Sequence, residues 1–255
     1  MSVVVVCSAH GAPGVTTTSL ALTWMWPAVH PDRKVLLLDA DPAGSGLLTG
    51  YLRAGVPDSA GVLALAAQRP PLSAEQTIEC ALALDADSTR MLLPGVSDPL
   101  QARPLAGTWT ALADTARELG RFGVDVVVDA GRLGHRYEPT SLLHAADVVV
   151  VMARSEIASL VPAAAAVRRL RDERPGRIAP VAVVVGDGYS PGEITTTLAV
   201  ADALPVALDA WTAGRFAEGG AQGWRFERSP LLRTVRAVIE RLAQLAPSPD
   251  LAVTS

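Results

Sequence analysis

Runs of consecutive apolar residues alternate with segments of helical length along most of this chain. The runs, of which only one contains a charged residue, cover residues 3–7, 35–38, 124–128, 148–151 and 180–185. A strand that is apolar at nearly every position is typical of a parallel sheet with both faces covered. Segments of helical length lie at residues 16–29, 108–121, 155–171 and 231–245. The alternation predicts an α/β fold built on a mainly parallel sheet.

The rest of the pattern is weaker. Between the second and third runs we expect short helices at 61–68 and 73–82 and a strand at 91–93. Pro27 is expected to end the first helix. Apolar positions at helical spacing in 231–245 predict a last helix that packs on the sheet. We therefore predict one domain over residues 1–246, followed by a disordered tail at 247–255.

The turn between the first apolar run and the first helix has the composition of a phosphate-binding loop. It consists of His10, Gly11, Ala12, Pro13, Gly14, Val15, Thr16 and Thr17. Glycines permit a tight turn, and the N-terminus of the following helix offers unpaired N–H groups and a partial positive charge. Thr16 stands where such loops place a magnesium-binding hydroxyl, but Val15 stands where they place a lysine. An ordinary strand-to-helix turn remains the alternative.

Carboxylates follow two of the apolar runs. Asp39 and Asp41 follow the run at 35–38, and Asp129 follows the run at 124–128. Residues two apart in a strand point to opposite faces, so a turn must begin at Asp39 if both of the first two carboxylates are to reach one site. An Asx turn at the end of a strand is the plainer interpretation of this pair.

Composition is consistent with one core and with a cytoplasmic protein. The chain has 255 residues, of which 49% are hydrophobic and 19% charged, and its net charge of −4 gives no general attraction to nucleic acid or to anionic membranes. Cys7 and Cys80 have no metal-ligand spacing, and no secretory signal precedes the first run. No apolar stretch approaches the roughly 20 residues needed to span a bilayer.

The chain contains a single lysine, Lys34, and every other basic side chain is arginine or histidine. Lys34 immediately precedes the run at 35–38, which places it at the N-terminal end of a strand. Ligands of open α/β sheets bind outside the C-terminal ends of the strands. Lys34 therefore cannot replace the lysine that is missing from the loop.

The loop and the Asp39 segment together resemble the ParA/MinD family of deviant P-loop ATPases. That family has the loop K-G-G-x-G-K-T-[ST] and a second strand that ends in D-x-D, and this chain has HGAPGVTT followed by VLLLDAD. The segment AADVVVVMARSEIASL also resembles the family. His10 and Val15 replace the two lysines of the pattern, and Ala12 replaces a glycine. The resemblance implies a doubly wound P-loop fold with helices on both faces of the sheet.

The resemblance also implies roles for individual residues. Thr16 and, through water, Asp39 and Asp129 would hold Mg²⁺, and Asp41 would position the attacking water if the site is active. ATP or ADP would lie on the loop. Asp187 stands near the position of the family's base-reading asparagine, so the identity of the base stays open. Arg132 is a candidate cation near the γ-phosphate.

Three functions follow as hypotheses. The leading one is a dimeric scaffold or switch that positions an unidentified partner protein, with ATP hydrolysis weak or absent because both lysines are missing. The second is an active ATPase in which an arginine supplies the missing charge. The third is a DNA-associated partition module that uses the only dense basic cluster, Arg168, Arg169, Arg171, Arg174 and Arg177. Acidic residues interrupt this cluster, so DNA binding is not favoured.

Overall fold

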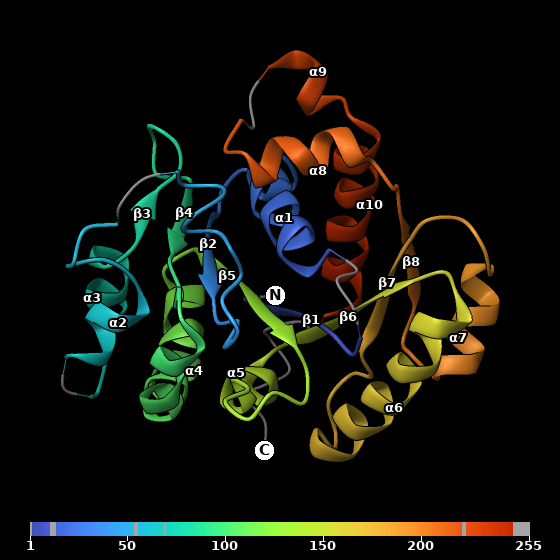
Figure 1. Ribbon diagram of the computed structural model, residues 1–255, viewed down its shortest axis with the longest axis horizontal. Coiled ribbons are helices and arrows are strands. Elements are labelled where there is room, and N and C mark those ends of the chain that lie inside the picture. Colours follow the sequence, from blue (N-terminus) through green and yellow to red (C-terminus); the bar gives the residue numbers. More distant parts are fainter. Residues whose placement is uncertain (1, 11–13, 54–55, 69, 221–222, 247–255) are drawn as a thin grey trace.

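The computed structural model describes residues 2–10, 14–53, 56–68, 70–220 and 223–246. Within these ranges the chain forms one sheet of eight strands in the order β3-β4-β2-β5-β1-β6-β7-β8 (Figure 1). All neighbouring strands pair in parallel except β3 and β4, which are antiparallel. The strands are β1 (Val3–Ser8), β2 (Lys34–Asp39), β3 (Leu82–Ala83), β4 (Arg90–Leu93), β5 (Val124–Arg132), β6 (Val148–Arg154), β7 (Val181–Val185) and β8 (Ala203–Val206).

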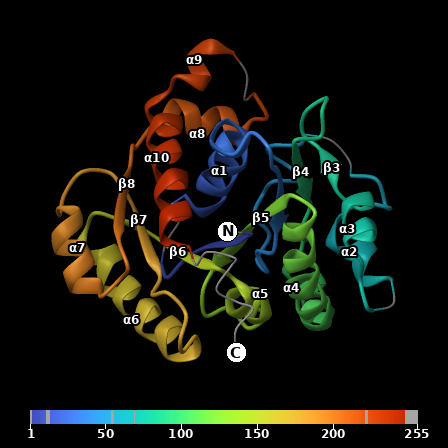
Figure 2. The same cartoon turned by 180° about the vertical axis from the view of Figure 1, so that it is seen from behind.

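Helices cover both faces of this sheet, as Figures 1 and 2 show from opposite sides. One face carries α1 (Val15–Val29), α8 (Ala210–Ala217), α9 (Trp224–Glu227) and α10 (Pro230–Leu245). The other face carries α2 (Gly61–Ala66), α3 (Ala74–Glu79), α4 (Ala106–Arg121), α5 (Thr140–Ala145), α6 (Ile157–Glu173) and α7 (Pro191–Leu198). A 3-10 helix at Pro99–Leu105 leads into α4. The predicted doubly wound, mainly parallel fold is confirmed.

The apolar runs form the centre of the sheet because both of their faces are buried. In β1, Val3, Val5 and Cys7 contact the layer that contains α4 and α6, whereas Val4 and Val6 contact the layer that contains α1 and α10. Successive side chains of a strand alternate between faces, so each apolar run contributes to both cores.

Two sequence expectations are adjusted by the structure. Pro27 lies inside α1, which continues to Val29 and is closed by a hydrogen bond from His30 N–H to the Trp26 carbonyl, 2.8 Å long. A proline in the last turn is tolerated because few further hydrogen bonds depend on it. The weakly patterned middle segment does form α2 and α3, which are shorter than predicted, and β4, which begins one residue earlier than predicted. The last helix packs on α1 and β8.

The strand order reverses at β1. From β1 the sheet extends through β5, β2 and β4 on one side and through β6, β7 and β8 on the other. Ligands of open α/β sheets bind outside the C-terminal ends of the strands at such a point. The fold therefore places the loop between β1 and α1 at the expected position for a ligand.

Candidate nucleotide-binding site

The first turn of α1 faces the crevice at the C-terminal end of β1. Gly14 precedes the helix with φ of 90°, a left-handed conformation that suits glycine, and its carbonyl accepts from Thr18 N–H at 2.8 Å. Among the residues that the structure describes, no side chain caps this end, and the first turn contains no acidic residue. The N–H groups of the turn therefore remain available to an anion.

The structure places most of the predicted loop at this end of the helix. Thr16 and Thr17 are half-buried in the first turn, and His10 is exposed beyond the end of β1. Val15 is 8% exposed and packs in the core between α1 and the sheet. The side chain in the lysine position thus serves packing and brings no charge. Gly11, Ala12 and Pro13 lie outside the described residues.

Two of the predicted carboxylates are side by side on neighbouring strands. Asp39 of β2 and Asp129 of β5 are in register, and both are buried, at 1% and 0% exposure. Asp39 Oδ2 accepts from the Ser45 hydroxyl at 2.6 Å. Asp129 Oδ1 accepts from Gly131 N–H at 3.0 Å, whereas its Oδ2 has no hydrogen-bond partner among the described residues.

Asp41 joins this pair through the turn that the sequence required. Its Oδ1 accepts from Ala43 N–H at 2.8 Å, and its own N–H points to Asp39 Oδ1 at 3.4 Å. Gly131 has φ of 60°, and a methyl group on its α-carbon would overlap the Asp41 carboxylate. The absence of a side chain at Gly131 therefore allows Asp41 to approach the end of β5. The structure brings together Asp39, Asp41 and Asp129, and it places them beside α1.

Among the described residues, no basic side chain forms an ion pair with these buried acids, which makes the group unusual. Burial, and secondarily the charge of Asp129, raises the pKa of Asp39 to about 8. Burial raises the pKa of Asp129 to about 6, although the Thr16 hydroxyl and Gly131 N–H favour its charged form. Buried carboxylates with shifted pKa values in a ligand crevice are typical of functional sites.

The donor set fits a magnesium ion that keeps most of its water. Mg²⁺ prefers oxygen ligands, and proteins commonly hold it with one or two carboxylates or hydroxyls together with phosphate oxygens and water. The unpartnered Asp129 Oδ2 and the adjacent Thr16 hydroxyl supply such oxygens. Within the described ranges, no three His, Cys, Asp or Glu side chains are placed to enclose a metal by themselves. The site would therefore depend on a phosphate ligand to complete the coordination.

On the other side of the α1 N-terminus lies a cavity of about 170 Å³. Gly14, Thr17 and Thr18 form one wall. The remaining wall is mainly apolar and comes from the ends of the outer strands and from the segments that follow them, including Val185, Val206, Ala207, Leu208 and Leu231. An apolar cavity beside a helix N-terminus suits a flat organic group that is attached to an anion.

Two polar residues of this cavity were not predicted from the sequence. Arg154, the last residue of β6, contributes to its lining, and so does Asp209, which caps α8 by accepting from Thr212 N–H at 3.0 Å. A charged residue directly after an apolar run was the available signal for Arg154. By contrast, Asp187 is exposed and does not line this cavity. Arg132 is exposed at the end of β5, on the side of the carboxylates.

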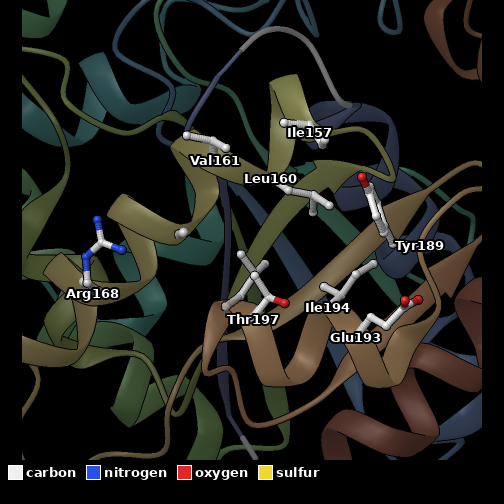
Figure 3. Close-up of a pocket in the computed structure, with 10 residues that line it drawn as sticks. Ile157, Leu160, Val161, Arg168, Tyr189, Glu193, Ile194 and Thr197 are labelled. Atoms are coloured by element: carbon white, nitrogen blue, oxygen red, sulfur yellow. The ribbon is translucent and has the colours of Figure 1, made fainter.

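The arginine cluster is not a continuous basic surface. Arg169 pairs with Glu138 and Glu173. Arg174 is 4% exposed and donates to the Ala146 carbonyl at 2.7 Å. Arg168 lies at one end of an apolar groove of about 350 Å³ between α6 and α7, to which Val161 and Tyr189 contribute (Figure 3). None of the predicted nucleotide-site residues lines that groove.

Comparison with solved structures gives the fold a class. MinD from Aquifex aeolicus superimposes with a TM-score of 0.69 and 18% identity over 97% of this chain and 99% of that one. A ParA family ATPase from Chlorobium tepidum superimposes with a TM-score of 0.73 and 15% identity, over 94% of this chain and 98% of that one. MinD of Pyrococcus horikoshii, solved with Mg-ADP, superimposes with a TM-score of 0.71 and 15% identity, over 95% of this chain and 97% of that one. The chain has the fold of the MinD and ParA ATPases.

No protein-family model and no curated protein matches the sequence. The resemblance that the loop and the aspartates indicated is thus supported by structure at low sequence identity. Within the described residues, no helix has both the length and the apolar composition that crossing a bilayer requires.

Proposed function

We propose that this chain binds a nucleoside triphosphate or diphosphate with Mg²⁺ and acts as a ParA/MinD-like positioning switch with weak or absent hydrolysis. The observation that carries the proposal is the buried pair Asp39 and Asp129 beside Thr16, at the sheet edge where β1 meets α1. These acids lower the stability of the empty protein, so a bound cation explains their presence better than packing does.

Binding depends on groups that this chain retains. The first turn of α1 would offer N–H donors to phosphate oxygens, and the Thr16 hydroxyl and the Asp129 carboxylate would hold a magnesium ion. Mg²⁺ would neutralise phosphate charge when bound. The Mg-ADP complex of the Pyrococcus MinD structure supports this assignment by similarity of fold.

Turnover depends on groups that this chain lacks. Phosphoryl transfer relies on positioning and on neutralising the charge that develops in the transition state. With Val15 packed in the core, no lysine reaches the phosphates from the loop. Asp41 would orient the attacking water if the site is active, but orientation without charge neutralisation would give slow hydrolysis. Nucleotide occupancy, with dimerisation coupled to it, would then serve as the switch for a partner protein.

The decisive experiment is equilibrium binding of ATP, ADP and GTP to the purified protein, with and without Mg²⁺, alongside its mass in solution. Micromolar, Mg²⁺-dependent binding that shifts monomer to dimer supports the switch. No binding at millimolar nucleotide contradicts it. GTP and ATP are both included because Asp187 lies away from the cavity and no base reader has been identified.

The competing hypothesis is an active ATPase, which the position of Asp41 against Gly131 favours. Phosphate release in the presence of Mg-ATP distinguishes the two. A rate that is well above that of buffer and is abolished by Asp41→Ala would establish an enzyme. In the proposed switch, wild type and Asp41→Ala release phosphate equally slowly while both bind nucleotide.

A further inference from the structure

The two sides of the α1 N-terminus carry different charged side chains: three carboxylates lie on one side, and Arg154 and Asp209 line the cavity on the other. The carboxylates of Asp39, Asp41 and Asp129 lie toward β2 and β5, on one side of β1. Arg154 lies on the other side, at the end of β6, where it pairs in register with Val185 of β7. Figure 1 shows α1 above the centre of the sheet, with β2 and β5 on one side and β7 and β8 on the other. A nucleotide on this helix end would therefore lie between the three carboxylates and Arg154.

Arg154 is held at this place by its backbone and is free at its side chain. Its N–H donates to the Ser159 hydroxyl at 2.9 Å, and the strand ladder fixes its α-carbon. Within the described ranges, its guanidinium forms no hydrogen bond and no ion pair, and it is the only basic residue among those that line the 170 Å³ cavity. An arginine without a protein partner, beside Gly14 and Thr17, is available to an anionic ligand.

We propose that Arg154 supplies the positive charge that the phosphate loop lacks, by binding the phosphates nearest the base of a nucleotide. This inference rests on the proposed function. The base would occupy the apolar part of the cavity near Val206 and Leu208. The buried, unpartnered Asp129 Oδ2 on the opposite side independently marks where a metal and the terminal phosphates belong. These two ends fix the direction of the phosphate chain across the first turn of α1.

The position of the charge separates binding from hydrolysis. A cation on the base side stabilises the α- and β-phosphates, which ATP and ADP share. It does not neutralise the charge that develops at the γ-phosphate during transfer. Arg154 would thus restore affinity without restoring the rate.

The test compares Arg154→Ala and Arg154→Lys with wild type in titrations of Mg-ATP and Mg-ADP at fixed ionic strength. Loss of a charge-assisted contact is expected to weaken both nucleotides by the same factor, about tenfold to hundredfold, and lysine should restore part of it. Arg177→Ala removes an equal charge from an exposed position outside the cavity and should change nothing. The thermal midpoint of nucleotide-free Arg154→Ala should equal that of wild type.

The outcomes separate this inference from the proposed function. If wild type binds nucleotide and the dissociation constants of Arg154→Ala stay within twofold of the wild-type values, the role of Arg154 is overturned. The proposed function then still stands. A loss confined to ATP would place the arginine at the γ-phosphate and overturn its assignment to the base side. Failure of wild type to bind either nucleotide at millimolar concentration would overturn both.

Discussion

At the scale of single residues, two aspartates of one strand show how the same side chain serves stability or function. Asp125, at the start of β5, is 1% exposed and accepts from Arg33 Nε and Nη2, both at 2.6 Å, and from Trp26 Nε1 at 2.9 Å. Asp129, four residues later, is equally buried but has no cation and an unpartnered oxygen. The first stabilises the fold, and the second costs stability.

Substitution of each aspartate by asparagine should therefore have opposite effects. Asp125→Asn leaves the Arg33 charge without its carboxylate and is expected to lower the free energy of unfolding by about 2 kcal/mol, since Arg33 is partly exposed. Asp129→Asn keeps an acceptor for Gly131 N–H and removes the buried charge, so it should raise the free energy of unfolding. Urea unfolding at pH 8 in EDTA measures both. Destabilisation by Asp129→Asn would show that its charge is compensated in the folded protein.

Asp39 gives the nucleotide-free protein a characteristic pH dependence. Its pKa is raised from 3.8 to about 8, so between about pH 4 and pH 8 the folded state binds a proton that the unfolded state has released. Its contribution to stability is thus complete below pH 4, is lost as pH rises through 8, and is constant above that. Asp39→Asn should remove this loss, so the difference in unfolding free energy between the variant and wild type should grow as pH rises.

The measurement is the urea midpoint of wild type and Asp39→Asn at each pH from 5 to 9, in EDTA. Asp114→Asn is the control because Asp114 is an exposed partner of Arg117, and its substitution should follow the wild-type curve. Equal slopes for wild type and Asp39→Asn would mean that Asp39 is already ionised in the folded protein at low pH.

At the scale of elements, the very short α9 connects two other helices of the layer that contains α1. Its Phe226 is fully buried and packs edge-on against Trp24 of α1 and Phe216 of α8, with ring centroids 5.5 and 5.0 Å apart. Its Trp224 is 74% exposed. One side chain of this short helix thus joins three helices on the face of α1.

Truncation of these two aromatic residues to alanine should therefore lower the free energy of unfolding by very different amounts. Phe226→Ala leaves a cavity between α1 and α8 and is expected to cost about 3–4 kcal/mol of unfolding free energy. Trp224→Ala, in the same helix, should change it by less than about 0.5 kcal/mol. Chemical denaturation of both variants tests the difference. Similar costs for the two would indicate that α9 is stabilised through its exposed side.

Elements differ in how well sequence predicts them. The central strands are recognisable because burial on both faces requires an unbroken apolar run, and α4 and α10 because their buried faces are long. The short α5 and α8 are not, since six to eight residues give too few turns for periodicity to decide. Arg154 was not predicted as a site residue because β6 continues three residues beyond its predicted run. The point at which the strand ends depends on its pairing with β7.

At the scale of the whole molecule, the sheet brings together residues that no local pattern connects. Asp39 and Asp129 are 90 positions apart in sequence but adjacent in register, because β5 inserts between β1 and β2. The motif resemblance predicted that they share a site, whereas their burial and mutual repulsion depend on the completed sheet. The same applies to the cavity, whose walls come from α1, α8, α10 and the ends of β6, β7 and β8.

Because the proposed site depends on the assembled sheet, nucleotide binding would stabilise the entire domain. A ligand that binds only the folded state stabilises it by RT ln(1 + [L]/Kd), about 2.7 kcal/mol at one hundred times Kd. Mg-ATP should therefore raise the thermal midpoint of wild type by several degrees, and ATP in EDTA should raise it less. Asp129→Asn should begin with a higher midpoint and gain little from Mg²⁺, because in the proposed site the carboxylate that destabilises the nucleotide-free protein would also hold the metal.

The two proteins should consequently change order. In EDTA the variant should be the more stable protein, and with saturating Mg-ATP the wild type should gain more and become the more stable one. Such a reversal cannot arise from a purely structural aspartate, whose replacement shifts both conditions equally. A constant difference between the two proteins in all conditions would place the magnesium ion away from Asp129, and the buried acids would then need another explanation.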